Sequence, residues 1–146
     1  MLTTPHAAAG IALGAVFADP LLVAPVAAGS HFLLDSVPHW QETLAPYIPT
    51  NKTYVRVPID IALAVGITLL AVHWQPQHST AIWTGAIFAN LPDLDSVVVL
   101  VPGLKKGIIQ KYWDWHCKIQ RETSSFWGLL PQAFVVAVGL VIAHKA

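Results

Sequence analysis

The chemistry that this sequence can support is carried by histidines and aspartates whose spacing suits a metal ion. His31 and Asp35 are four positions apart, so on a helix their side chains lie on one face and can bind the same ion. Pro38 ends that helix and allows His39 to turn back toward it. The predicted metal ligands are His6, His31, Asp35, His39, Asp93, Asp95 and His116.

Asp93 and Asp95 form the second pair of candidate ligands. On an unbroken helix, residues two apart point in nearly opposite directions, but Pro92 predicts a break at this point. In an extended stretch, residues two apart project to one side, so both carboxylates would then reach one ion. Histidine and aspartate ligands without clustered cysteines are typical of Zn²⁺ and also suit Mn²⁺ or Fe²⁺, in a centre of one ion or two.

The elements that must position these residues are predicted to be membrane helices. Hydrophobic residues form 55% of the 146-residue chain and charged residues form 11%, whereas soluble domains carry about 25% charged residues. The mean hydropathy is +0.57. Eight basic and eight acidic residues are too few to cover a soluble surface, so we expect much of the surface to face lipid. The length fits a single domain, residues 1–146. The formal net charge of zero gives no reason to expect a nucleic-acid partner.

Five mainly apolar segments predict an all-α, polytopic integral membrane protein. They cover residues 7–18, 21–37, 57–74, 80–101 and 124–143. The first two are shorter than the roughly 20 residues of a full span. They therefore predict either a thin pair of spans or a re-entrant helical hairpin, with a turn at Asp19-Pro20. Polar stretches at residues 39–54 and 103–123 predict two long loops, of which the second is amphipathic.

Basic residues predict which membrane face carries the candidate ligands. Seven of the eight Lys and Arg residues fall in or next to the two long loops, which this topology places on one side, and that side is expected to be cytoplasmic. The seven predicted ligands, together with Asp60 at the start of the third segment, fall on the same side. His73 and His78 flank the connection on the opposite side and His144 is near the end of the chain, so these three are excluded from the site.

Each candidate also has a structural interpretation. His6 and His116 could be interfacial residues, and the His-x-x-x-Asp pair could be a hydrogen bond at a helix end. Asp95 could cap a helix, and Asp60 could sit at a helix start, where the dipole favours a negative charge. However, acidic residues at membrane depth cost about 2.5–3.5 kcal/mol each, so they are candidates for function by default. Four carboxylates and four imidazoles on one side therefore favour a metal site.

A metal site at a membrane face predicts a hydrolase that acts on a phosphoester, with a lipid head group as one candidate substrate. The metal would lower the pKa of a bound water toward about 7 and polarise the phosphoryl oxygen. Asp60 is predicted to be the general base, and Arg121 or Lys118 to neutralise the substrate phosphate. Two alternatives stay open: a divalent-metal transporter or channel, and a structural membrane protein with a degenerate site. The apolar run at residues 133–143 offers no polar groups to a permeation path, which favours the hydrolase.

Three motifs resemble those of the inner-membrane-associated metal-dependent hydrolases. They are Thr-Pro-His-Ala-Ala-Ala-Gly at residues 4–10, Ser-His-Phe-Leu-Leu-Asp-Ser-Val-Pro-His at residues 30–39 and Leu-Pro-Asp-Leu-Asp at residues 91–95. The resemblance implies a location in the inner (plasma) membrane and a metal-dependent hydrolytic activity. Two features differ from that family: residues 120–124 match its His-Arg-x-x-Thr-His-Ser motif only in part, and the order of the other two motifs is reversed.

Overall fold

The computed structural model describes residues 1–41, 51–98, 101 and 103–146, and this part of the chain is all-α, as predicted. The helices of the bundle are α1 (Thr3–Phe17), α2 (Pro20–Asp35), α3 (Asn51–Trp74), α4 (Ser79–Asn90) and α7 (Ser125–Lys145). The remaining elements are the 3₁₀ turns η1 (Pro76–His78) and η2 (Leu91–Asp93), the short α5 (Leu94–Val98) and α6 (Gly107–Ile119).

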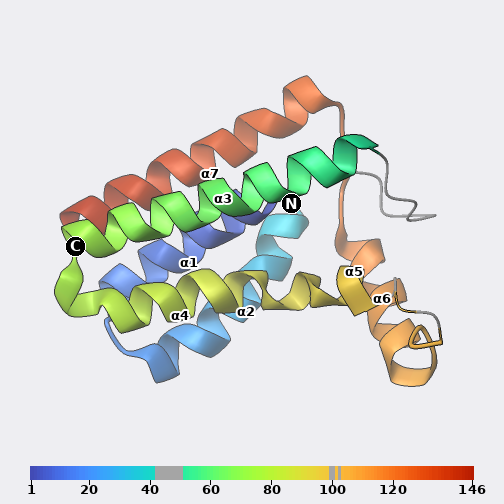
Figure 1. Ribbon diagram of the computed structural model, residues 1–146, viewed down its shortest axis with the longest axis horizontal. Coiled ribbons are helices and arrows are strands. Elements are labelled where there is room, and N and C mark those ends of the chain that lie inside the picture. Colours follow the sequence, from blue (N-terminus) through green and yellow to red (C-terminus); the bar gives the residue numbers. More distant parts are fainter. Residues whose placement is uncertain (42–50, 99–100, 102) are drawn as a thin grey trace.

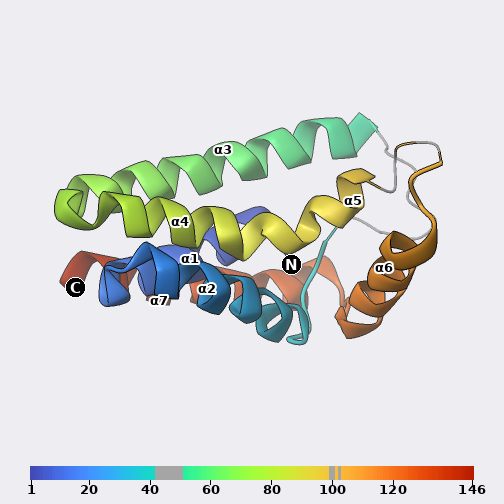
Figure 2. The same ribbon diagram turned by 90° about the horizontal axis from the view of Figure 1, so that it is seen from below.

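The bundle helices alternate in direction and enclose α1. Helices α1, α3 and α7 run away from the end of the bundle that carries α5 and α6, whereas α2 and α4 run toward it (Figure 1). The view turned by 90° shows α1 between α3 and α4 on one side and α2 and α7 on the other (Figure 2), and α1 packs against all four. The C-terminal ends of α2 and α4 therefore meet at the end of the bundle where α5 and α6 lie.

Glycines let α1 and α4 approach to backbone contact. A Cβ atom at Gly10 would overlap the carbonyl of Gly85, and a Cβ atom at Gly85 would overlap the carbonyl of Gly10. Gly14 meets the backbone of Ala81 and Ile82 in the same way. Small residues of this kind are how helices pack closely where lipid removes the hydrophobic drive for their association. The contact fixes α1 against the helix that leads into η2.

The predicted turn between the first two segments is confirmed. Ala18 ends α1 in the left-handed region, with φ of 56°. Asp19 then caps α2, because its Oδ1 accepts a hydrogen bond of 2.9 Å from the amide of Leu21. Pro20 occupies the first turn of α2, where a missing amide hydrogen costs nothing. The result is a helical hairpin of α1 and α2.

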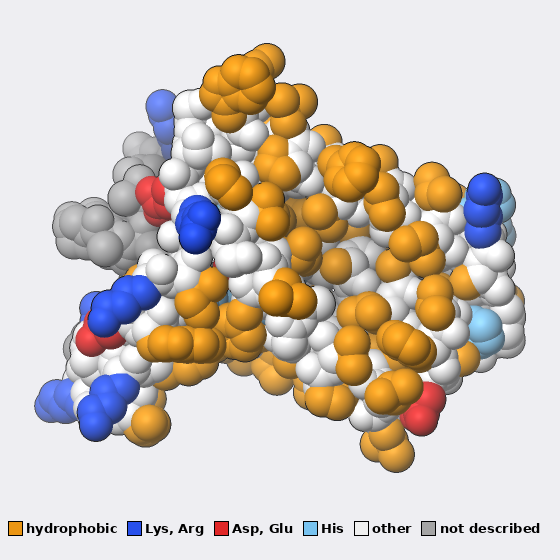
Figure 3. All heavy atoms as spheres, turned by 180° about the vertical axis from the view of Figure 1, so that it is seen from behind, with side chains coloured by type: hydrophobic (Ala, Val, Ile, Leu, Met, Phe, Trp, Pro, Cys, Tyr) orange, Lys and Arg blue, Asp and Glu red, His pale blue; other side chains and the backbone are white. Residues whose placement is uncertain are grey.

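Two helices in the described part of the chain, α3 and α7, are long and apolar enough to cross a membrane. They have 24 and 21 residues, and each contains an 18-residue stretch with a mean hydropathy of 2.0. Large apolar side chains are exposed on both, for example Leu63 and Phe134, and such side chains spread over the face shown in Figure 3. Helices α1, α2 and α4 have 15, 16 and 12 residues. A helix lies in each of the five predicted segments, whereas membrane crossing by any of them stays a prediction.

The structure corrects several predicted boundaries. Helix α3 begins at Asn51, so residues 51–54 are helical rather than part of a loop; residues 42–50 of that predicted loop lie outside the described residues. The predicted segment at 80–101 is divided into α4, η2 and α5, because Pro92 has no amide hydrogen with which to continue α4. Residues 99 and 100 of this segment are likewise outside the described part. The amphipathic stretch at 103–123 contains a helix, α6.

Candidate metal centre

Four side chains bring one ligand atom each to within 4.8 Å of the others, and this group could hold a metal ion: His31, Asp35, Asp93 and His116. His31 and Asp35 lie in the last part of α2, Asp93 ends η2, and His116 lies in the last turn of α6. The predicted meeting of residues from separate stretches of sequence is therefore confirmed for these four.

The separations between the ligand atoms fit a small metal ion. His31 Nε2 and His116 Nε2 each lie 3.1 Å from Asp35 Oδ2, and they lie 3.2 Å from each other. Asp93 Oδ1 is 3.5 Å from His31 Nε2 and 4.0 Å from His116 Nε2. Ligand atoms about 2.0–2.1 Å from a zinc ion, at the corners of a tetrahedron, are about 3.3–3.4 Å apart. Three donors are therefore closely grouped, and Asp93 stands slightly outside them.

Burial separates Asp93 from the other three residues. The side chains of His31 and Asp35 are fully buried and that of His116 is 2% exposed, whereas the side chain of Asp93 is 30% exposed. Two buried imidazoles and a buried carboxylate need charged or polar partners, since isolation in an apolar interior is costly. The four residues supply those partners to one another, and Asp93 marks the side from which the centre can be reached.

Hydrogen bonds behind both histidines direct their Nε2 atoms toward the centre. His31 Nδ1 is 2.7 Å from the carbonyl oxygen of Ala89, which can only accept, so this nitrogen carries the proton. His116 Nδ1 is 2.8 Å from Asp95 Oδ2. Such outer partners fix the ring orientation of metal-binding histidines and increase their basicity. Both Nε2 atoms are thereby placed to bind a metal.

The prediction that Asp95 is itself a ligand is corrected by this contact. Residues 94–98 form helix α5 rather than an extended stretch, so Asp93 and Asp95 do not project to the same side. Asp93 reaches the centre, while Asp95, 5% exposed, lies behind His116.

The carboxylates next to His116 raise the pKa of its imidazole. Burial alone would lower the pKa of its imidazole, but hydrogen bonds to Asp35 and Asp95 outweigh burial and raise this pKa to about 9. In the metal-free protein the ring is therefore protonated at neutral pH. A metal ion that binds at Nε2 has to displace this proton.

His6 lies next to the centre but outside the group of four. Its ring stacks on that of His31, with centroids 4.0 Å apart, and its Nε2 is 3.1 Å from Asp35 Oδ1. The backbone nitrogen of Met1 contacts the same oxygen. His6 therefore contacts Asp35 Oδ1, whereas His31 and His116 contact the other carboxylate oxygen, Asp35 Oδ2. The Nδ1 atom of His6 is buried without a hydrogen-bond partner among the described residues.

His39 is buried near the centre but is also outside the group of four. Its Nδ1 is 2.7 Å from the carbonyl oxygen of Val37, and its Nε2 is 3.1 Å from Gln41 Oε1. The backbone explains this orientation: the His39 amide donates to the Arg121 carbonyl and its carbonyl accepts from the Thr123 amide, both at 2.9 Å. The chain after Pro38 is held by this short parallel pairing and does not turn back to the ligands of α2, contrary to the prediction.

Asp60, predicted as the general base, caps α1. Its carboxylate accepts hydrogen bonds from the amides of Thr3 and Thr4, at 2.5 and 3.1 Å, and from the Thr4 hydroxyl at 2.6 Å. The first turn of a helix has amide hydrogens without intrahelical partners, and a carboxylate from α3 satisfies them here. The structure thus gives Asp60 a structural role and no place among the four ligands.

Arg121 has an exposed side chain beside the C-terminus of α2. Its backbone amide donates a hydrogen bond of 3.3 Å to the carbonyl of Asp35. This contact keeps the residue close to a ligand-bearing turn. Its predicted contact with a substrate phosphate stays a prediction.

Gln132 is a supporting residue that the sequence prediction missed. It is 3% exposed, its Oε1 accepts from the Leu2 amide at 2.9 Å, and its Nε2 donates to the carbonyls of Trp40 and Gly128. It thus joins α7 to the start of α1 and to the chain after α2. The signal was available, because a lone amide side chain at the start of an otherwise apolar run needs a buried partner.

No protein family, curated protein or solved structure matches the chain in the three comparisons with known proteins.

Proposed function

We propose that the chain is an integral membrane, metal-dependent hydrolase that acts on a phosphoester. The observation that carries this proposal is the group of His31, Asp35, Asp93 and His116, whose ligand atoms lie within 4.8 Å of one another at one end of the bundle. The two outer hydrogen bonds, to Ala89 and Asp95, support it, because they are the arrangement expected behind metal-binding histidines.

Zinc is the ion that these donors fit best. Two imidazole nitrogens and one or two carboxylate oxygens are suitable ligands for Zn²⁺, and Mn²⁺ or Fe²⁺ would also accept them. Catalytic zinc sites keep three protein ligands and one open position. His31, His116 and Asp35 form the close group of three, and the more distant, part-exposed Asp93 lies beside the open side.

The metal would supply activation of a water and polarisation of the phosphoryl oxygen. Asp93 is the residue best placed to accept a proton from an attacking water, because it is next to the centre and is the one member of the four that solvent reaches. Asp35 would offset part of the charge of the bound metal, and Asp95 holds His116 in place. Arg121 or Lys118 would neutralise the substrate phosphate, as expected from the sequence.

Elemental analysis of protein purified in detergent tests the metal centre. We expect about one transition-metal ion per chain, and loss of most of it in His31→Ala and Asp35→Ala. His73→Ala is the matched control, since His73 is exposed at the end of α3 and should leave the metal content unchanged. Folded wild-type protein that binds no metal on titration with zinc would refute the proposal.

Hydrolysis is tested with an aryl phosphodiester, bis(p-nitrophenyl) phosphate. We expect metal-dependent cleavage that Asp93→Asn reduces at least 10²-fold while the protein stays folded, because the substitution removes the carboxylate and hardly changes its shape. Ion flux into proteoliposomes without cleavage of any ester would instead favour a transporter. Bound metal with neither activity would favour a structural role.

Membrane orientation is a further part of the proposal. The apolar surfaces of α3 and α7 support a membrane location, and the basic residues near the metal-binding end support a cytoplasmic position for that end. Single cysteines at Lys52 and Lys106, in a Cys117→Ser background, should both react with a membrane-impermeant reagent from the cytoplasmic side. A cysteine at Gln77 should react from the opposite side. Reaction of Lys52 and Lys106 variants from different sides would refute this topology.

A further inference from the structure

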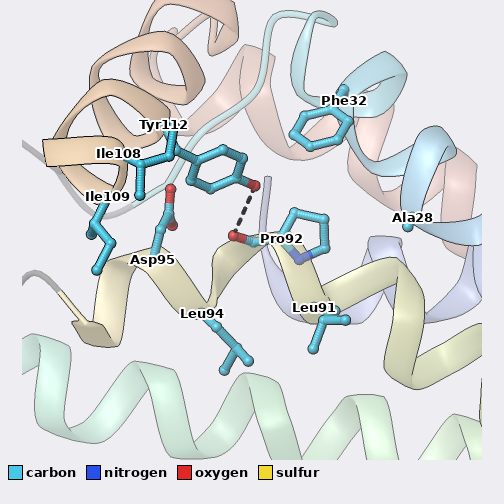
Figure 4. A pocket seen from close by; sticks show the side chains of 9 residues that line it. All are labelled: Ala28, Phe32, Leu91, Pro92, Leu94, Asp95, Ile108, Ile109 and Tyr112. Carbon is cyan, nitrogen blue, oxygen red and sulfur yellow. Dashed lines mark hydrogen bonds between the residues drawn. The ribbon is translucent and has the colours of Figure 1, made fainter.

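An apolar groove of about 630 Å³ opens beside the candidate metal centre. Ala28 and Phe32 of α2 form one wall, Ile108 and Tyr112 of α6 form the other, and residues of η2 and α5 lie between them (Figure 4). The volume is within the range of about 300–1,000 Å³ that is typical of ligand sites. The groove is open rather than enclosed, so a ligand could enter it from the side.

The groove shares its walls with the metal centre. Phe32 follows His31 in α2, and its ring lies edge-on to those of His31 and His116, with centroids 5.3 and 5.5 Å away. Pro92, which lines the groove, precedes Asp93. A molecule that occupies the groove therefore has one end next to the ligands of the metal.

The polar groups in the lining already have partners. The Tyr112 hydroxyl is 3.3 Å from the carbonyl oxygen of Pro92, as Figure 4 shows, and Asp95 is bonded to His116. Burying further polar atoms against this surface would leave them without hydrogen bonds, which is unfavourable. The occupant of the groove should therefore be apolar over most of its length.

The surroundings of the groove point to lipid. Leu91, Leu94 and Ile108 are 42%, 53% and 78% exposed at its edges, an arrangement that lipid tolerates better than water does. Helix α6 also carries basic residues, and Lys and Arg side chains are gathered at this end of the molecule in Figure 3. Apolar chain and anionic phosphate, side by side, are the chemistry of a phospholipid.

We infer that the groove binds an acyl chain of a membrane phospholipid and so places the head-group phosphoester at the candidate metal centre. This inference rests on the proposed function, which it narrows from any phosphoester to those of membrane lipids. A lipid could reach the groove within the plane of the membrane, without leaving the bilayer.

Photolabelling tests the groove without requiring turnover. The full-length protein is reconstituted in phosphatidylglycerol vesicles that contain a phosphatidylglycerol with a diazirine on one acyl chain, and the labelled peptides are found by mass spectrometry. We expect the α2 and α6 peptides that line the groove to be labelled at least threefold more than the exposed face of α7. Ala28→Trp, which fills the groove, should remove most of this excess.

Ala137→Trp is the matched control, because Ala137 is exposed on α7 and far along the chain from every residue that lines the groove. It should leave the labelling of the groove unchanged. If Ala28→Trp fails to fold, Leu94→Trp at the groove's edge takes its place. Labelling of the groove no stronger than that of α7, or labelling that neither tryptophan reduces, would overturn the inference.

The outcomes for the groove and for the hydrolase are distinguishable. Cleavage of the soluble aryl phosphodiester together with an unlabelled groove would refute the lipid site and leave the hydrolase. A strongly labelled groove that is blocked by tryptophan, without cleavage of any phosphoester, would support lipid binding and refute the hydrolase.

Discussion

Replacement of Asp95 gives the sharpest test of how the centre is built. Asp95 does not belong to the four ligands, yet its Oδ2 is 2.8 Å from His116 Nδ1 and it is 5% exposed. Removal of such an outer partner typically weakens metal binding about 10–100-fold, which is about 1.4–2.8 kcal/mol. A buried hydrogen bond to a charged group is independently valued at about 1.5–3 kcal/mol. We therefore expect Asp95→Ala to weaken zinc binding about 30–100-fold.

Asp95→Asn separates the charge from the hydrogen bond. Its amide oxygen can still accept from His116 Nδ1, so we expect a smaller loss of about tenfold. Asp114→Asn is the matched control. Asp114 lies in α6, two residues before His116, and its exposed carboxylate accepts a hydrogen bond from Gln110. It should change zinc affinity less than twofold.

Competition with a zinc chelator at pH 9 provides the measurement. At this pH the proton on His116, with a pKa of about 9, lowers the apparent affinity only about twofold. Loss of Asp95 also lowers the proton affinity of His116, and working at pH 9 keeps that opposite effect small. Zinc affinity of Asp95→Ala within twofold of the wild type would refute the role assigned to Asp95.

Three further predictions concern packing, capping and pH. Gly10→Leu should not give a folded, monodisperse protein, because the new side chain would overlap the backbone of Gly85. Gly66→Leu is the control and should fold, because a Cβ atom at Gly66 meets open space. Equal elution profiles of the two variants in size-exclusion chromatography would contradict this prediction. Asp60→Ala should lower the free energy of unfolding in detergent by about 1–2 kcal/mol without changing metal content, and a loss of metal would contradict the capping role. Apparent zinc affinity should fall as the pH falls below about 9. Competition between metal and proton at His116 alone gives up to about tenfold per pH unit, and the same competition at His31 makes the slope steeper. A flat profile in zinc titrations would argue against direct binding. The folding stability of the metal-free protein changes with pH in the opposite direction to the zinc affinity. The stability contributed by the protonated His116 is fully present below about pH 6.5 and is lost as the pH rises through about 9.

The sequence predicted those parts of the centre that depend on local spacing. The four-residue interval of His31 and Asp35 is sufficient to place both on one face of a helix, and the structure confirms it. Pro92 correctly marked the end of a helix and brought attention to Asp93. His116 was found because the two polar loops were expected at the same end of the bundle, and the structure places it there.

Contacts between distant segments of the chain set the positions of the residues that the sequence analysis placed wrongly. Asp95 is turned by α5 toward His116, a partner 21 positions later, and no local pattern encodes that docking. His39 is oriented by backbone pairing with the chain around Arg121 and Thr123. The carboxylate of Asp60 has the chemistry of a general base, but its role follows from its position on α3, where it accepts a hydrogen bond from the first turn of α1. Each of these outcomes depends on tertiary structure that spacing alone does not reveal.

The enclosed position of α1 has a consequence for the order in which the molecule is made. Helix α1 leaves the ribosome before α4 and α7, yet it packs against both, and Gly10 contacts a backbone made 75 residues later. The metal ligands are equally spread, from His31 to His116, so the full set exists only after α6 has been synthesised. Any metal that this group binds would therefore be loaded late, after the helices that carry its ligands have assembled. A newly made chain passes through a stage in which its early helices are present and charged residues such as Asp35 still lack their final partners.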